Sequence, residues 1–124
     1  MERVFGTLGA VSALGAVAAG AFGAHSLRGR LTTDQLAVFE TAARYQMYHA
    51  LALLLVSGTM TRGGGRWLEL SGWMFVVGTL LFSGSLYALV LTGVRSLGAV
   101  TPLGGLAFLA GWAFLAWGAW RPAP

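Results

Sequence analysis

The chain has no cysteine and no lysine, and it has only four acidic residues. Without cysteine there can be no disulfide, no thiolate metal ligand and no cysteine nucleophile. Charged residues make up 10% of the 124 residues, whereas a soluble domain carries about a quarter. Hydrophobic residues make up 56%, so most of the surface is not built to face water. The sequence therefore predicts an integral membrane protein.

The net charge of +4 comes entirely from arginine. These arginines stand singly between apolar runs and form no basic stripe interleaved with aromatic residues, which argues against nucleic-acid binding. Charges spaced in this way are typical of loops that fix membrane topology and contact anionic headgroups. The bilayer is therefore the expected partner.

Three stretches are free of charge, residues 4–27, 70–94 and 96–120, and each is long enough to cross about 30 Å of hydrocarbon. A more polar segment between the first two supplies a fourth candidate span. The predicted fold is all-α, a polytopic bundle of four antiparallel transmembrane helices forming one domain over residues 1–124. The expected helices cover residues 4–24, 33–60, 67–91 and 101–120.

Small residues repeat at four-residue spacing along the first predicted helix, at Gly15, Ala19 and Gly23. Such spacing allows two helix backbones to approach closely in lipid. Gly78 and Gly84 are expected to play the same part on the third helix, so all five are predicted packing positions.

Two helix starts can be predicted from the sequence. Thr32 followed three residues later by Gln35 is a capping-box pattern at the start of helix 33–60. Thr101 before Pro102 is typical of an N-cap with proline at the first helical position.

The helix over residues 33–60 carries the candidate polar site. At 100° per residue, Glu40, Arg44 and Tyr48 lie within about 80° of one another, and Tyr45 and His49 fall on the adjoining line. Glu40 and Arg44 have the order and spacing of an intrahelical ion pair. This sector is expected to face the bundle interior. The full candidate set is Glu40, Arg44, Tyr45, Tyr48, His49 and His25.

Two interpretations of this set remain open. Ionisable groups within a membrane are functional candidates, so the sector could relay protons or bind an anion. In the structural interpretation, Glu40 and Arg44 lie at the interface, the tyrosines join the aromatic belt, and His49 hydrogen-bonds a neighbouring helix. His25 ends the first helix, where a positive charge suits the helix dipole.

No cofactor, metal site or enzymatic activity is expected. The histidines lack a nearby His-x-x-x-His spacing or a carboxylate partner that would indicate a metal. Ser83 and Ser85 lack the glycine-elbow context of a serine nucleophile.

The arginines also predict topology. With four spans, Arg3, Arg62, Arg66 and Arg121 share the side of the termini, and Arg28, Arg30 and Arg95 lie on the other. The excess favours both termini in the cytoplasm.

Several segments resemble one family of small membrane proteins. The segments are GAFGAHSL (20–27), FETAARYQMYHALAL (39–53), SGSLYAL (83–89), and TPLGG with the following GW (101–105, 111–112). Together they resemble the YgdD/YwdK-like four-span proteins, a domain of unknown function with eukaryotic small transmembrane relatives. The resemblance covers nearly the whole chain and implies a four-helix bundle in the bacterial inner membrane. It brings no established activity and no catalytic residues.

The sequence thus favours a non-enzymatic inner-membrane protein, an assembly partner or accessory subunit that binds a membrane-protein partner or its own copies. The alternative is a small transporter or an ion or proton conduit, acting as a homo-oligomer through the polar sector of residues 40–49.

Overall fold

A computed structural model describes residues 1–122, so the last two residues of the predicted domain, 123–124, lie outside the described residues. Four long helices and one short 3₁₀ helix make up the described chain, and no strand is among them, which confirms the all-α prediction. The elements are α1 (Glu2–His25), α2 (Thr33–Met60), α3 (Arg66–Thr92), η1 (Arg95–Ala99) and α4 (Thr101–Trp120).

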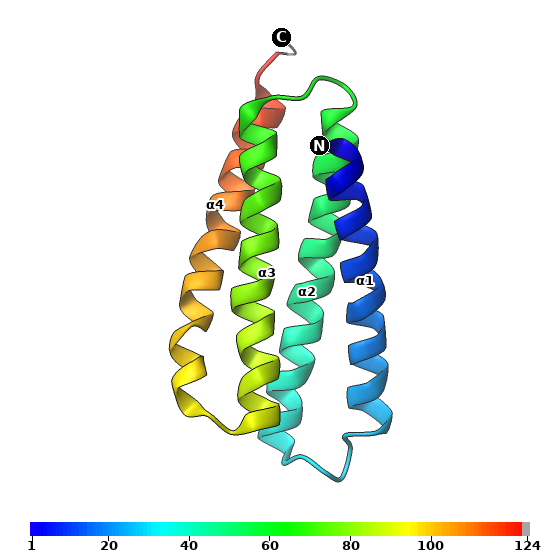
Figure 1. The fold of residues 1–124 in the computed structure, drawn as a ribbon, viewed down its shortest axis with the longest axis vertical. Helices are drawn as coiled ribbons and strands as arrows, with labels where there is room; N and C mark the ends of the chain where they lie inside the picture. The colour runs from blue at the N-terminus through cyan, green and yellow to red at the C-terminus, as the bar shows by residue number, and fades with distance from the viewer. Residues whose placement is uncertain (123–124) are drawn as a thin grey trace.

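The helices form an antiparallel bundle in which each packs chiefly on its neighbours in the chain. Figure 1 shows them side by side in the order α4, α3, α2, α1, with both termini at the same end. The pairs α1–α2, α2–α3 and α3–α4 make the extensive contacts, whereas α2 and α4 touch only sparsely. This leaves a gap in the packing between α2 and α4, with α3 behind it.

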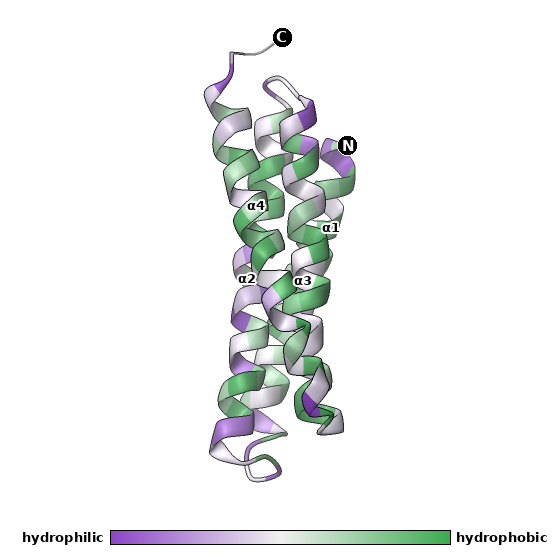
Figure 2. Cartoon of the chain, turned by 90° about the vertical axis from the view of Figure 1, so that its left-hand side faces the viewer, coloured by the Kyte–Doolittle hydropathy of each residue, from purple (hydrophilic) through white to green (hydrophobic). Residues whose placement is uncertain are grey.

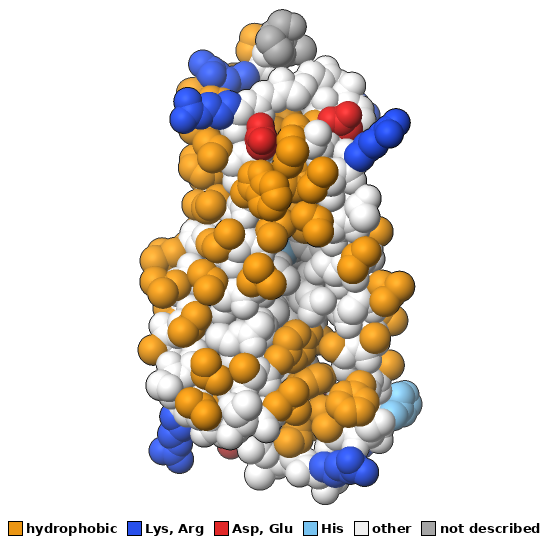
Figure 3. Space-filling model, in the orientation of Figure 1, with side chains coloured by type: hydrophobic (Ala, Val, Ile, Leu, Met, Phe, Trp, Pro, Cys, Tyr) orange, Lys and Arg blue, Asp and Glu red, His pale blue; other side chains and the backbone are white. Residues whose placement is uncertain are grey.

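Within residues 1–122, three segments are long and apolar enough to cross a membrane: α1, α3, and the stretch Arg95–Trp120 that holds η1 and α4. α2 falls short in hydropathy, and Figure 2 shows hydrophilic turns on it well inside the bundle. Nevertheless its 28 residues run the length of the bundle between α1 and α3. Figure 3 shows hydrophobic side chains over the middle of one face and charged side chains near the two ends, the distribution expected of a spanning bundle.

Glycines let bulky rings pass close to the backbone of a neighbouring helix. A Cβ at Gly104 on α4 would overlap the backbone of Phe82 on α3. Likewise, a Cβ at Gly111 would lie 2.7 Å from a ring carbon of Phe75. The α3–α4 contact therefore depends on small residues, as is usual in lipid, where dispersion replaces the hydrophobic effect.

Four of the five predicted packing residues lie against a neighbouring helix, and one does not. Gly15 faces the Gln46 side chain and Gly23 faces the Phe39 ring, both on α2, and Ala19 borders the same apolar cluster as Phe39. Gly78 faces the Phe108 ring on α4. The prediction for Gly84 is wrong: among the described residues, no heavy atom of a neighbouring helix lies within 4 Å of where its Cβ would be.

The two predicted caps also differ in outcome. Thr32 Oγ1 accepts from Gln35 N at 3.1 Å and the Gln35 side chain accepts from Thr32 N at 3.0 Å, so the capping box is confirmed. Thr101 is not the cap of α4. The N-cap is Val100, and the Thr101 hydroxyl instead pairs with Ser85 Oγ at 2.6 Å on α3.

Candidate functional site

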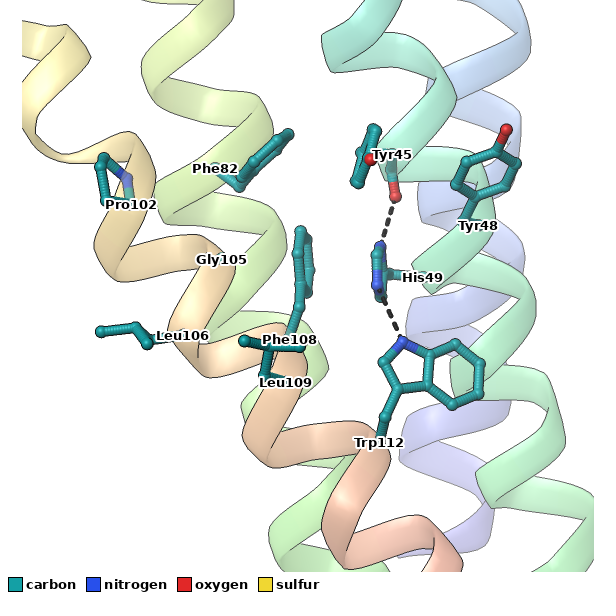
Figure 4. A pocket seen from close by; sticks show the side chains of 10 residues that line it. All are labelled: Tyr45, Tyr48, His49, Phe82, Pro102, Gly105, Leu106, Phe108, Leu109 and Trp112. Carbon is teal, nitrogen blue, oxygen red and sulfur yellow. Dashed lines mark hydrogen bonds between the residues drawn. The ribbon is translucent and has the colours of Figure 1, made fainter.

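A groove of about 740 Å³ opens between α2 and α4, with α3 as its floor. Aromatic side chains from all three helices line it: Tyr45, Tyr48, His49, Phe82, Phe108 and Trp112. Figure 4 shows His49 between Phe108 and Trp112, and Tyr45 beside Phe82. The groove exists because α2 and α4 touch only sparsely, so that rings rather than backbone meet across it.

Both ring nitrogens of His49 are hydrogen-bonded. Nδ1 lies 2.7 Å from the carbonyl oxygen of Tyr45, one turn earlier on α2. Nε2 lies 3.2 Å from the indole Nε1 of Trp112 on α4. A carbonyl can only accept and an indole N–H can only donate. The geometry therefore fixes a neutral imidazole with its proton on Nδ1 and its acceptor on Nε2 (Figure 4).

The imidazole of His49 is also enclosed by rings. It stacks on Phe108 with the centroids 3.4 Å apart and the planes 4° from parallel, and Phe75 lies 5.6 Å away. Only 4% of the residue is exposed. With both nitrogens engaged, this histidine is arranged to join α2 to α4. Its bond to Trp112 is the contact with a neighbouring helix that the structural interpretation expected.

Glu40 and Arg44 do not face the interior, so the prediction of an inward polar sector is wrong for them. Both are exposed, about 160° around α2 from the buried Ala42. Neither forms an ion pair within residues 1–122, where the one such pair joins the N-terminal amine to Glu2. The expected intrahelical pair is therefore absent from the described chain. The 100° spacing places these residues on one side of α2 correctly, but it cannot tell which side the bundle covers.

Arg44 lies well inside the length of α2. It follows Thr33 by 11 residues and precedes Met60 by 16, or about 16 Å and about 24 Å along the axis. A hydrocarbon layer about 30 Å thick, centred on this helix, would leave about 6 Å at each end. With that placement, the Arg44 backbone would lie about 10 Å inside the layer.

Tyr45 and Tyr48 sit at a similar depth, one on each side of the midpoint of α2. They are 37% and 51% exposed, and their rings meet edge to face at 5.6 Å. Neither hydroxyl has a hydrogen-bond partner among residues 1–122. This position does not agree with an interfacial aromatic belt, which lies at the headgroups rather than at the centre.

His25 takes no part in the groove. It is the last residue of α1 and is exposed at the end of the bundle, whereas His49 lies 16 residues into α2. Over the described residues, no group of three or more His, Cys, Asp or Glu side chains lies close enough to hold a metal ion.

A second polar centre, not anticipated from the sequence, is built around Gln46. Its Nε2 donates to the Ser12 carbonyl on α1 at 2.9 Å, and its Oε1 accepts from the Tyr87 hydroxyl on α3 at 2.7 Å. Nearby, the buried Ser83 hydroxyl donates to the Ala42 carbonyl at 2.7 Å. One feature of the sequence could have indicated this role of Gln46: it precedes His49 by one helical turn and so shares the buried face of α2.

Comparisons with known proteins identify a family of membrane proteins. Residues 19–105 match the family described as "Protein of unknown function (DUF423)". A UPF0382 membrane protein of Staphylococcus epidermidis (strain ATCC 35984) is 50% identical over 102 residues, covering 80% of each chain. The UPF0382 membrane protein YwdK of Bacillus subtilis is 45% identical over 100 residues, covering 80% of this chain and 81% of its own.

No solved structure matches the chain. The names of the relatives confirm the predicted class of membrane protein and give no activity. On the match over residues 19–105 and on these identities, the chain belongs to the DUF423 family of small bacterial membrane proteins.

Proposed function

We propose that this protein is a non-enzymatic assembly partner in the bacterial inner membrane. It binds a transmembrane helix of another membrane protein along the outward face of α2, beside the groove between α2 and α4. The observation that carries the proposal is the exposure of Arg44 and Glu40 with no partner in the described chain, deep within the length of α2.

The physical reason is the cost of leaving such groups in lipid. An arginine near the centre of a transmembrane helix costs about 2.5–3.5 kcal/mol on insertion scales. Arg44 can lower this cost by reaching toward the start of α2, because helical side chains tilt that way. A carboxylate on a partner helix would remove much of the free-energy cost that is left for Arg44. The same helix could also supply a hydrogen-bond acceptor for the Tyr48 hydroxyl.

The groove supports the same proposal because it adjoins this face. Tyr48 is on its rim, and its apolar lining includes Leu106 and Leu109 of α4. A helix lying on α2 could place one bulky apolar side chain in the groove while meeting Arg44 with an acidic one. The partner is thus a transmembrane helix that combines a carboxylate with an apolar anchor.

The conduit alternative has less support. It rests on a homo-oligomer in which the polar sector of Glu40, Arg44, Tyr48 and His49 carries the ion or proton. The outward position of Glu40 and Arg44 and the two engaged nitrogens of His49 favour a binding surface and an interhelical tie instead.

A site-specific photocrosslinker tests the proposal in living cells. It is introduced in place of Tyr48, and the matched control carries it at Leu14, which is 72% exposed on α1. We expect one crosslinked product of defined mass at position 48, none at position 14, and loss of the product when Arg44→Leu is added. The same protein should co-purify stoichiometrically in mild detergent.

Three outcomes would count against the proposal. They are equal products at positions 48 and 14, a product that contains only a second copy of this chain, and a product that Arg44→Leu leaves unchanged. Thermal unfolding of the purified Arg44→Leu variant shows whether the bundle itself is intact. It should be, because Arg44 has no ion pair with the described residues.

A further inference from the structure

A second hollow, of about 890 Å³, lies at the end of the bundle that holds both termini. Its wall is formed by the α2–α3 loop and by the adjoining ends of α3 and α4. Three arginines line it, Arg62 in the loop, Arg66 at the first position of α3, and Arg121 directly after α4. Positive charge from three separate points of the chain thus converges on one hollow.

The arginines have no acidic partner in the described chain. Glu2, at the same end, is 3.3 Å from the N-terminal amine. Glu69 lies one turn after Arg66 on α3, does not line the hollow, and makes no ion pair among residues 1–122. Figure 3 shows basic side chains at this end of the molecule, together with acidic ones, and further basic side chains at the opposite end. Three like charges around one hollow repel one another, so an anion placed among them is stabilised.

The rest of the wall is apolar or uncharged. Trp67 and Gly118 line the hollow beside Leu68, which is only 2% exposed. Gly118 brings α4 against Leu68, since a Cβ there would lie 2.8 Å from a leucine methyl carbon. Arg121 is 5.6 Å from the Trp117 ring centroid, a cation–π distance. The hollow therefore has a cationic rim and an uncharged wall that includes the apolar side chains of Trp67 and Leu68.

We propose that this hollow is a binding site for the phosphate headgroup of an anionic phospholipid. Arginine binds phosphate through paired N–H donors, and tryptophans lie at headgroup level in membrane proteins. The cationic rim takes the phosphate, and Trp67 and Leu68 contact the start of the acyl chains. Free phosphate offers the same charge but nothing for the apolar wall, so the lipid is the expected source.

Native mass spectrometry of the purified full-length protein tests the site, with phosphatidylglycerol and phosphatidylcholine as the probes. We expect a preference of about tenfold for phosphatidylglycerol, equivalent to about 1.4 kcal/mol. The variant Arg62→Gln/Arg66→Gln/Arg121→Gln should lose it. The matched control, Arg28→Gln/Arg30→Gln/Arg95→Gln, removes the same charge from the opposite end and should keep it. The single variant Arg121→Gln, at a residue outside every helix, should reduce the preference for phosphatidylglycerol.

Inorganic phosphate is added in a separate arm, and it should not displace the bound phosphatidylglycerol. Displacement would overturn the lipid assignment in favour of a free anion. Equal binding of both lipids, or equal loss in the two triple variants, would overturn the site itself. Unfolding temperatures in detergent establish that each variant is folded, and the exposure of these arginines predicts little change.

Discussion

The indole N–H of Trp112 donates to Nε2 of His49 across 3.2 Å, which joins α4 to α2 through residues 63 positions apart. These helices otherwise touch only sparsely. The bond also determines which nitrogen of His49 carries the proton. Because the Trp112 indole N–H can only donate, Nε2 must be the acceptor and the proton lies on Nδ1.

Replacing Trp112 by phenylalanine should therefore weaken the bundle. Interhelical hydrogen bonds in membranes are worth about 0.6 kcal/mol on average and up to about 1.7, and the loss should fall in that range. Chemical unfolding in detergent measures it. Trp120→Phe is the control, since Trp120 is 83% exposed.

Nitrogen NMR of the wild type should show His49 neutral with its proton on Nδ1; an imidazolium signal at neutral pH would contradict the geometry.

Gly104→Ala should destabilise the α3–α4 contact. The added methyl group overlaps the backbone of Phe82, which cannot move as a side-chain end can. Overpacking of this kind costs about 1–3 kcal/mol. Gly84→Ala is the matched control on α3, where nothing lies within 4 Å. There alanine should be neutral or stabilising by up to about 1 kcal/mol, because it has the higher helix propensity. Equal unfolding free energies for both variants would refute so close an approach of α4 to α3.

Gln46 and Tyr87 should be energetically coupled. Gln46→Leu leaves the Tyr87 hydroxyl without its acceptor, and Tyr87→Phe leaves Gln46 Oε1 without its donor. A double-mutant cycle on unfolding free energy should give a coupling of about 0.5–1.7 kcal/mol. The pair Gln46 and Tyr45 provides a comparison, because Tyr45 makes no hydrogen bond with Gln46. A coupling near zero for Gln46 and Tyr87 would show that the bond does not form in the membrane.

Thr32→Ala should loosen the first turn of α2. It removes the acceptor for Gln35 N, at a cost of about 1 kcal/mol. Hydrogen exchange of the amides at residues 33–36 should accelerate, while exchange at the middle of α2 stays slow. Thr33→Ala, one residue further on, alters no hydrogen bond of the capping box and should leave the exchange unchanged.

Single cysteines can report topology without background, because the chain has none of its own. Gly64→Cys lies in the α2–α3 loop and Ser26→Cys lies at the opposite end of the bundle. If the termini are cytoplasmic, a membrane-impermeant maleimide added outside spheroplasts should label Ser26→Cys and leave Gly64→Cys unlabelled. The reverse pattern would invert the proposed orientation.

The sequence is sufficient for features that depend on near neighbours in the chain. Charge spacing predicts four helices, and the capping box at Thr32 and Gln35 follows from a three-residue interval. Lateral packing is not accessible in this way. A helical wheel places Glu40 and Arg44 on one side of α2, but it does not reveal that α1 and α3 cover the other side.

The candidate site shows the same limit. The sequence marks His49 as a residue with a possible partner on a neighbouring helix, yet that partner on α4 lies 63 positions away. Gln46 does not stand out because the surrounding charges and aromatic residues dominate the polar pattern. Local spacing allows Thr101 to be a cap, whereas its hydroxyl is engaged by Ser85 across the α3–α4 contact.

The polarity of α2 has a consequence for how the chain enters the bilayer. Its inward polar side chains find acceptors on α1, Gln46 at the Ser12 carbonyl and Ser57 at the Glu2 carbonyl. α1 is the more apolar of the two and leaves the ribosome first. The acceptors for Gln46 Nε2 and Ser57 are therefore synthesised before α2, whereas the donors from Tyr87 and Trp112 follow with α3 and α4. Pairing with α1 as a helical hairpin thus offers α2, the least apolar of the four long helices, its first polar partners.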